Sequence, residues 1–293
     1  MHTNPRSRYL RDTAPELPRP GLVWDCLNGG TNRPDDRIMF NKLLIHLPRL
    51  RQDAKANTQF RHLAVLHLLS RGIRQFLDLG SGVPVWKRPL HNVITDADPD
   101  ARILYVDHDE VVCERSRERI GTTASALALH ANVTKPEGVF GSQEFADLFD
   151  PSQPLAILAT NVFQHVSEAD SPRRLLAAYR AECVPGSALV IAHPTAYDLT
   201  PSQTEPVTRL HREGDYPYIF RTTDEITALF EGYQILPGGL LSDQPEPRAV
   251  PIARWDTPAH RADPTLSALA HLFYGGVGIL RRPEPDPEGG TQP

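Results

Sequence analysis

The chain has 293 residues, a formal net charge of −5 at pH 7, and 40% hydrophobic and 23% charged residues. This composition is typical of a globular protein, and the acidic balance disfavours nucleic acid, whose phosphates attract basic surfaces. No apolar run approaches the ~18 residues of a membrane span, and Cys26, Cys113 and Cys183 are too scattered for a disulfide framework or a zinc site. We therefore predict a cytoplasmic protein that binds a small molecule, without a membrane, nucleic-acid or metal partner; the oligomeric state stays open, a homodimer included.

The first part of the chain, residues 1–71, is predicted to form an N-terminal arm and a helical cap. Residues 1–21 are polar and contain several prolines, and residues 22–37 combine aromatic, double-glycine and charged positions that are typical of a loop. Apolar periodicity then predicts helices over 37–46 and 52–70, the second with a largely buried C-terminal half.

From residue 72 onward, short apolar runs alternate with helical segments. The predicted strands cover 74–79, 102–106, 126–131, 155–160, 188–192, 233–236 and 273–280. Helices are predicted over 89–97, 110–120, 143–149, 172–182 and 222–230, with a lid over 195–221 and a long loop over 242–265. This alternation predicts an α/β fold over 72–282, with a doubly wound, seven-stranded, mostly parallel sheet and right-handed crossovers. Residues 283–293 have the composition of a disordered tail.

Polar side chains follow the predicted strands where these end. The five positions are Asp78, Asp107, Asn132, Asn161 and His193. Carboxyl ends of parallel strands meet at one edge of a sheet, and open α/β sheets bind their ligands at that edge. We therefore expect the functional site there.

The first of these strands ends in Asp78-Leu79-Gly80-Ser81-Gly82, a turn with few side chains. A dinucleotide would place a pyrophosphate on such a turn, and at ~4 Å the Asp78 carboxylate would repel it by roughly 1 to 4 kcal/mol. S-adenosylmethionine (SAM) carries an ammonium, a sulfonium and a ribose diol but no phosphate, so an acidic turn suits it. An ordinary strand-to-helix turn remains the alternative.

Six segments, in order along nearly the whole chain, resemble motifs of a bacterial S-adenosyl methyltransferase family with the Rossmann-like fold of class I SAM-dependent methyltransferases. They are Trp24 to Thr31, Phe76 to Pro84, Tyr105 to Glu110, Ala192-His193, Glu225 to Gly232 and Tyr274 to Gly278. The departures lie mainly on the acceptor side, where Trp24 and Thr31 replace a tyrosine and a lysine and Phe163-Gln164-His165 shifts the histidine by one position.

The resemblance implies a SAM-dependent methyltransferase with a small-molecule acceptor, in specialised metabolism. It implies cofactor-binding roles for Asp78, Gly80, Ser81 and Gly82 (methionine end), Asp107 and His108 (ribose), Asn132 and Val133 (adenine) and Asn161 (sulfonium). His165 and His193 are the candidate general bases, and Trp24, Gln164 and Tyr197 the candidate acceptor-binding residues. Two alternatives stay open: an enzyme of this fold that catalyses a cyclisation or rearrangement without methylation, and a SAM-binding sensor or partner-binding module. Structural roles remain the alternative for each single residue.

Overall fold

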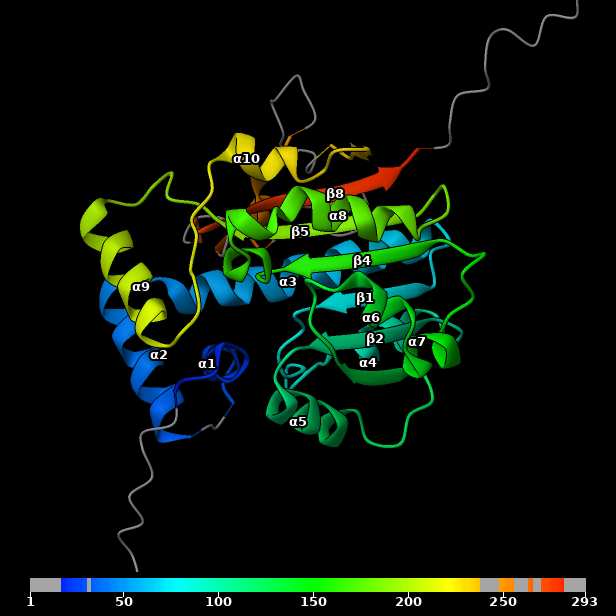
Figure 1. Ribbon diagram of the computed structural model, residues 1–293, viewed down its shortest axis with the longest axis horizontal. Coiled ribbons are helices and arrows are strands. Elements are labelled where there is room, and N and C mark those ends of the chain that lie inside the picture. Colours follow the sequence, from blue (N-terminus) through cyan, green and yellow to red (C-terminus); the bar gives the residue numbers. More distant parts are fainter. Residues whose placement is uncertain (1–16, 31–32, 238–247, 256–262, 266–269, 282–293) are drawn as a thin grey trace, which may run out of the picture.

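The computed structural model describes residues 17–30, 33–237, 248–255, 263–265 and 270–281. Its centre is an eight-stranded sheet with the order β3-β2-β1-β4-β5-β8-β6, in which β7 pairs with β8 (Figure 1). The strands are β1 Gln75–Leu79, β2 Arg102–Asp107, β3 Ala126–His130, β4 Leu155–Thr160, β5 Ala188–Pro194, β6 Tyr233–Ile235, β7 Val250–Pro251 and β8 Phe273–Leu280. The seven predicted strands are confirmed, and the two-residue β7 is added to them.

The first five strands pair with one another in parallel, and β8 runs antiparallel to β5, β6 and β7. Strands β1, β4 and β5 are buried along their whole length, as expected for a sheet that is covered on both faces. The fold is therefore the doubly wound α/β architecture that the alternation of strands and helices predicts.

Helices cover both faces of the sheet. They are α1 Pro20–Leu27, α2 Pro34–His46, α3 Leu50–Ser70, α4 Leu90–Ala97, α5 Glu110–Ile120, α6 Pro136–Phe140, α7 Gln143–Leu148, α8 Pro172–Ala181, α9 Pro201–Glu213 and α10 Thr223–Ala228, with short 3-10 turns η2 Phe163–His165, η3 Glu168–Asp170 and η4 Ile252–Arg254. Because side chains alternate along a strand, Phe76 packs with α3 and α4 on one face and Leu77 with α7, α8 and α10 on the other.

The loop predicted for residues 22–37 is wrong at its start, where the structure has helix α1. Four apolar residues of this helix, Leu22, Val23, Cys26 and Leu27, follow a helical spacing and are buried, and Pro20 occupies a first-turn position that tolerates proline. The short apolar stretch gains most of its stability from this tertiary packing, which local sequence does not reveal.

Helix α1 lies over the glycine turn that follows β1. Arg19 pairs with Asp109 at 2.6 Å, and Arg119 pairs with Asp25 at 3.1 Å, so both ends of α1 are tied to α5. Figure 1 shows α1, α2 and α9 grouped beside the arrowheads of β1, β2 and β4. These three helices therefore roof the carboxyl edge of the parallel strands, and α9 lies in the segment predicted as a lid.

None of the described helices is both long and apolar enough to cross a lipid bilayer. The predicted arm lies outside the described residues as far as residue 16, and so does the predicted tail, residues 283–293. The domain boundary at residues 71 and 72 stays a prediction.

Candidate functional site

A cavity of about 300 Å³ lies between the carboxyl edge of the sheet and the roof of α1, α2 and α9. One end is lined by the glycine turn and by the residues that follow β2, β3 and β4. The other end is lined by aromatic and apolar side chains: Trp24, Leu27, Leu43, Leu47, Leu50, Val207, His211, Tyr216 and Tyr218. The cavity thus joins a polar end to an apolar end.

The glycine turn depends on backbone that other residues adopt with strain. Gly80 and Gly82 both have φ near +59°, in the left-handed region that side chains disfavour. A Cβ atom on Gly80 would lie 2.4 Å from Cγ2 of Val162, and one on Gly21 would lie 3.4 Å from Cα of Gly82. Gly80 therefore lets the loop after β4 approach the turn closely, and the contact between Gly21 and Gly82 does the same for α1. Gly80, Ser81 and Gly82 all line the cavity.

Asp78 lies behind the cavity wall rather than on it. Its side chain is 1% exposed and forms an ion pair with Arg61 of α3, whose guanidinium lines the cavity. Burial raises the pKa of Asp78 to about 6, and the positive charge of Arg61 opposes that rise. Oδ1 of Asp78 and Nε of Arg61 are buried without a hydrogen-bond partner in the part of the chain that the structure describes.

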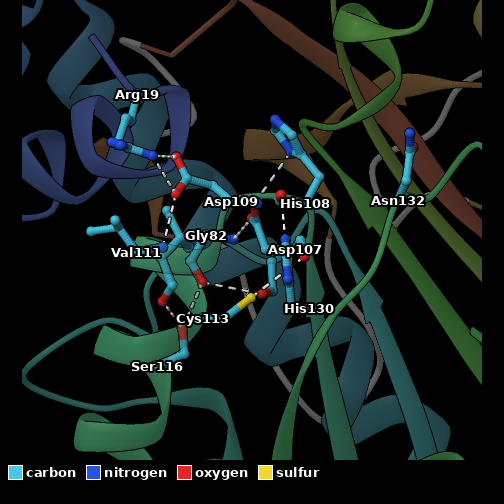
Figure 2. Close-up of polar contacts among 12 residues, drawn as sticks. Arg19, Gly82, Asp107, His108, Asp109, Val111, Cys113, Ser116, His130 and Asn132 are labelled. Atoms are coloured by element: carbon cyan, nitrogen blue, oxygen red, sulfur yellow. Dashed lines mark hydrogen bonds and ion pairs between the residues drawn. The ribbon is translucent and has the colours of Figure 1, made fainter. Parts of the chain in front are cut away.

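The two aspartates at the end of β2 have different positions. Asp107 lines the cavity, where its Oδ2 accepts a hydrogen bond from the Gly82 amide at 3.0 Å and its Oδ1 accepts one from the Asp109 amide at 3.1 Å. Asp109 instead caps α5 through the Val111 amide and binds Arg19 (Figure 2). Asp107 is therefore the carboxylate available to a ligand. Its Oδ2 keeps a second lone pair, whereas its Oδ1 also contacts the Nδ1 of His108 at 3.5 Å.

His108 and Asn132 flank this carboxylate at the cavity mouth. His108 is exposed, and a hydrogen bond to Asp107 raises the pKa of its imidazole. The Asn132 Oδ1 accepts bonds from both the amide and the hydroxyl of Thr134, at 2.9 Å each. Figure 2 shows the Asn132 side chain standing apart from the aspartates. Since both lone pairs of its oxygen are used, Asn132 can offer a ligand only its Nδ2 donors.

The residues after β4 bring unpartnered polar atoms to the cavity. Thr160, Asn161 and Gln164 all line it. Among the described residues, no hydrogen-bond partner is found for the buried Oγ1 of Thr160, for Oδ1 and Nδ2 of Asn161, or for Oε1 of Gln164. Each such group costs about 1–3 kcal/mol when nothing binds it. Several together at a cavity wall indicate a ligand site, because buried polar groups are normally satisfied.

The apolar end contains a cluster of rings from the loop after β4, from α9 and from the segment after α9. His211 lies 4.2 Å from Tyr218 between ring centroids, and His165 lies 5.9 Å from His211. Tyr216 meets both imidazoles edge-on at 5.4 Å. Burial lowers the pKa of His165 to about 4 and that of His211 to about 3, so both rings are neutral at pH 7.

The structure places three predicted site residues outside the cavity: Asp78, which is described above, His193 and Tyr197. Strand β5 extends beyond its predicted end because β8 pairs with it as far as Pro194, so His193 lies inside the sheet and is 1% exposed. Its Nδ1 contacts the Pro194 carbonyl and its Nε2 accepts from Arg221 at 2.6 Å. Burial and the Arg221 charge lower the pKa of His193 to about 3. Because both ring nitrogens already have partners, neither has a lone pair that could take a proton from a substrate. Tyr197 is 74% exposed and is not part of the cavity wall.

The cavity brings together the other predicted residues: Trp24, Gly80, Ser81, Gly82, Asp107, His108, Asn132, Val133, Asn161, Gln164 and His165. Sequence reasoning missed Arg61, His211 and the Leu43–Leu47–Leu50 wall. Arg61 could have been noticed because it is a charged residue in a helix whose C-terminal half is predicted to be buried. Within the described ranges, no group of three or more His, Cys, Asp or Glu residues could hold a metal ion.

Comparison with known proteins adds family evidence to this geometry. Residues 9–281 match the family described as S-adenosyl methyltransferase. A DUF574 family protein from Streptomyces avermitilis is 25% identical with a TM-score of 0.79, covering 90% of this chain and 98% of its own. A candidate methyltransferase from Thermobifida fusca is 30% identical with a TM-score of 0.79, covering 91% of this chain and 96% of its own.

At 8% identity, the plantazolicin methyltransferase BamL shares the fold with a TM-score of 0.50, over 89% of this chain and 97% of its own. The comparison with curated proteins gave no match. The family match over nearly the full length agrees with the sheet topology and with the glycine turn. This chain therefore belongs to the S-adenosyl methyltransferase family.

Proposed function

We propose that this protein transfers a methyl group from SAM to a small-molecule acceptor bound at the apolar end of the cavity, in specialised metabolism. The observation that carries the proposal is one continuous cavity with two chemically different ends. Its polar end has the groups that a zwitterionic nucleoside requires. Its apolar end has no unpaired charged side chain among the described residues that line it. Cys26, Cys113 and Cys183, all among the described residues, form no disulfide, which supports action in the cytoplasm.

The residues of the polar end fit SAM. Arg61 would bind the methionine carboxylate, and Asp78 would hold Arg61 in place rather than contact the cofactor itself. Asn161, whose amide atoms lack partners, would receive the methionine ammonium or the region of the sulfonium. Asp107 would accept hydrogen bonds from the ribose hydroxyls, and Val133 with the Nδ2 of Asn132 would meet adenine.

Bound SAM supplies an electrophilic methyl group on its sulfonium. The protein contributes by positioning, because holding two reactants about 3 to 3.5 Å apart provides most of the acceleration of such a displacement. The roof of α1, α2 and α9 excludes water from the acceptor end. Of the two predicted bases, only His165 lines the cavity.

The acceptor end also carries several of the departures from the family pattern. Trp24, Gln164 and His165 all line it. The polar end retains the family turn with Asp78, Gly80 and Gly82. This contrast supports a shared cofactor and an acceptor that differs from those of other family members.

Isothermal titration calorimetry with SAM and S-adenosylhomocysteine (SAH) tests the proposal. We expect binding at about 100 μM, within the ordinary range of enzyme affinities, and loss of that binding in Asp78→Ala. The matched control is Asp98→Ala, which removes an ion pair with Arg74 at the opposite edge of the sheet. Absence of SAM binding by the wild-type protein would exclude the function, and stoichiometric SAH release during turnover separates methylation from a rearrangement.

A further inference from the structure

At the acceptor end, main-chain carbonyls determine which nitrogen atoms of His211, His165 and Gln164 donate their hydrogens. His211 is 6% exposed and lines the cavity, and its Nδ1 lies 2.8 Å from the Val207 carbonyl oxygen. A carbonyl can only accept, so the ring proton is on Nδ1. The Nε2 of His211 is therefore a lone-pair acceptor.

His165 and Gln164 follow the same rule. The Nδ1 of His165 donates to the Pro217 carbonyl at 2.8 Å, which leaves Nε2 as an acceptor. The Gln164 amide donates one N–H to the Asn161 carbonyl at 2.8 Å and the other to that Nε2 at 3.3 Å. With both donors used, Gln164 offers only Oε1, which is buried and unpartnered in a side chain 4% exposed overall.

The surroundings of these acceptors are aromatic and uncharged. The faces of His211 and Tyr218 are inclined by 38°, and Tyr216 stands edge-on to His211 at 82°. Apolar side chains of α1, α2, α3 and α9 complete the wall. Among the described residues that line the cavity, the one Lys or Arg side chain, Arg61, is paired with Asp78, and the carboxylate, Asp107, belongs to the polar end.

We infer that the acceptor end takes a neutral, planar aromatic or heteroaromatic molecule carrying an O–H or N–H group, which donates its hydrogen bond to Gln164 Oε1; a second O–H or N–H hydrogen on the molecule would be donated to His211 Nε2. This inference rests on the proposed function and names its substrate class. A carboxylate or phosphate would be repelled by the lone pairs of Gln164 Oε1 and His211 Nε2, and this end offers it no unpaired cation among the described residues. A molecule without the hydrogen would leave Gln164 Oε1 buried and unpaired, which a polar site discriminates against strongly.

Three matched probes test this substrate class on the full chain saturated with SAH: 2-naphthol, 2-methoxynaphthalene and 2-naphthoate. We expect 2-naphthol to bind on the order of 10- to 100-fold more tightly than the other two, because only it can donate a hydrogen bond to Gln164 Oε1. Equal or tighter binding of the ether or the carboxylate would overturn the inference, and so would the absence of 2-naphthol binding at 1 mM. If SAH itself fails to bind, the proposed function fails instead, so the two failures are distinguishable.

Two variants and a spectroscopic measurement locate the effect. His211→Asn places an amide nitrogen where Nδ1 donates to Val207 but removes the acceptor at Nε2, and Gln164→Leu removes Oε1. Gln164→Leu should lower 2-naphthol affinity about tenfold, and His211→Asn should lower by a similar factor the affinity for 2-naphthylamine, which carries two N–H hydrogens. Neither variant should change the affinity for the ether, and the control His46→Asn should leave all three affinities unchanged. Long-range ¹H–¹⁵N correlation spectra should show His211 and His165 as Nδ1–H tautomers, and an Nε2–H tautomer at His211 would contradict the inference.

Discussion

The ion pair between Arg61 and Asp78 leads to a sharp prediction about stability. Arg61→Met preserves the length of the side chain but leaves the Asp78 carboxylate buried without a countercharge. Removing one partner of a buried pair costs about 3–5 kcal/mol, because the remaining charge is not solvated. Asp78 is 1% exposed, so water cannot replace the guanidinium.

The loss of stability in Arg61→Met depends on pH because the buried Asp78 carboxylate titrates. Asp78 has a pKa of about 6 in the folded protein and the ordinary aspartate pKa of 3.8 in the unfolded chain. The difference of about 2.2 corresponds to about 3 kcal/mol. The folded state binds the proton more tightly, so stability falls as the pH rises from 3.8 to 6. Without Arg61 the folded pKa rises further, and the fall continues above pH 6.

Urea denaturation at pH 5 and pH 8 measures this effect. We expect Arg61→Met to lose about 3–5 kcal/mol relative to the wild type at pH 8 and clearly less at pH 5, where Asp78 holds a proton in the variant. The double variant Arg61→Met/Asp78→Asn should recover most of the pH-dependent loss. A loss that is equal at both pH values, or a double variant as unstable as the single one, would refute the role given to the pair.

Three further predictions concern the surrounding framework. Arg221→Met should destabilise the protein in urea denaturation by about 1–3 kcal/mol for each of two carbonyls of the loop after β4, which lose the guanidinium donor that now lies at 2.8 and 3.2 Å. Gly80→Ala should cost more than Gly82→Ala: both share about 1–2 kcal/mol of left-handed strain, but only the first drives a methyl into Val162. Asp53→Asn should stabilise the protein at pH 8 by up to about 3 kcal/mol and not at pH 3.5, because burial raises the pKa of Asp53 to about 6 and its charge is lost below that value.

Each of these predictions has a contradicting result. An unchanged midpoint for Arg221→Met would show that the loop after β4 is held by other contacts. Equal losses at the two glycines would show that the neighbouring Val162 yields without strain. A gain for Asp53→Asn that is the same at pH 3.5 and pH 8 would show that the effect is packing rather than titration.

The order of strands and helices could be read from the sequence because apolar periodicity and turn residues are local signals. Each predicted strand forms within two residues of its expected ends, and the glycine turn is where the Asp78 segment places it. Helix α1 was missed because its stability comes from packing on Gly82 and Val112, residues distant in sequence. His193 was misplaced because the length of β5 is set by its pairing with β8.

The residues of the cofactor end could be predicted from local sequence signals, whereas those of the acceptor end could not. Asp78, Gly80, Gly82, Asp107 and Asn161 follow strands, so the sequence by itself determined that they meet at one edge of a parallel sheet. The acceptor wall joins α1, α2, α9 and the segment after α9, which no local pattern links, and only the tertiary structure decided that His211 and Tyr218 face Gln164 and His165. The physical reason is that strand ends are aligned by backbone hydrogen bonds, whereas the roof is positioned by side-chain packing between distant segments.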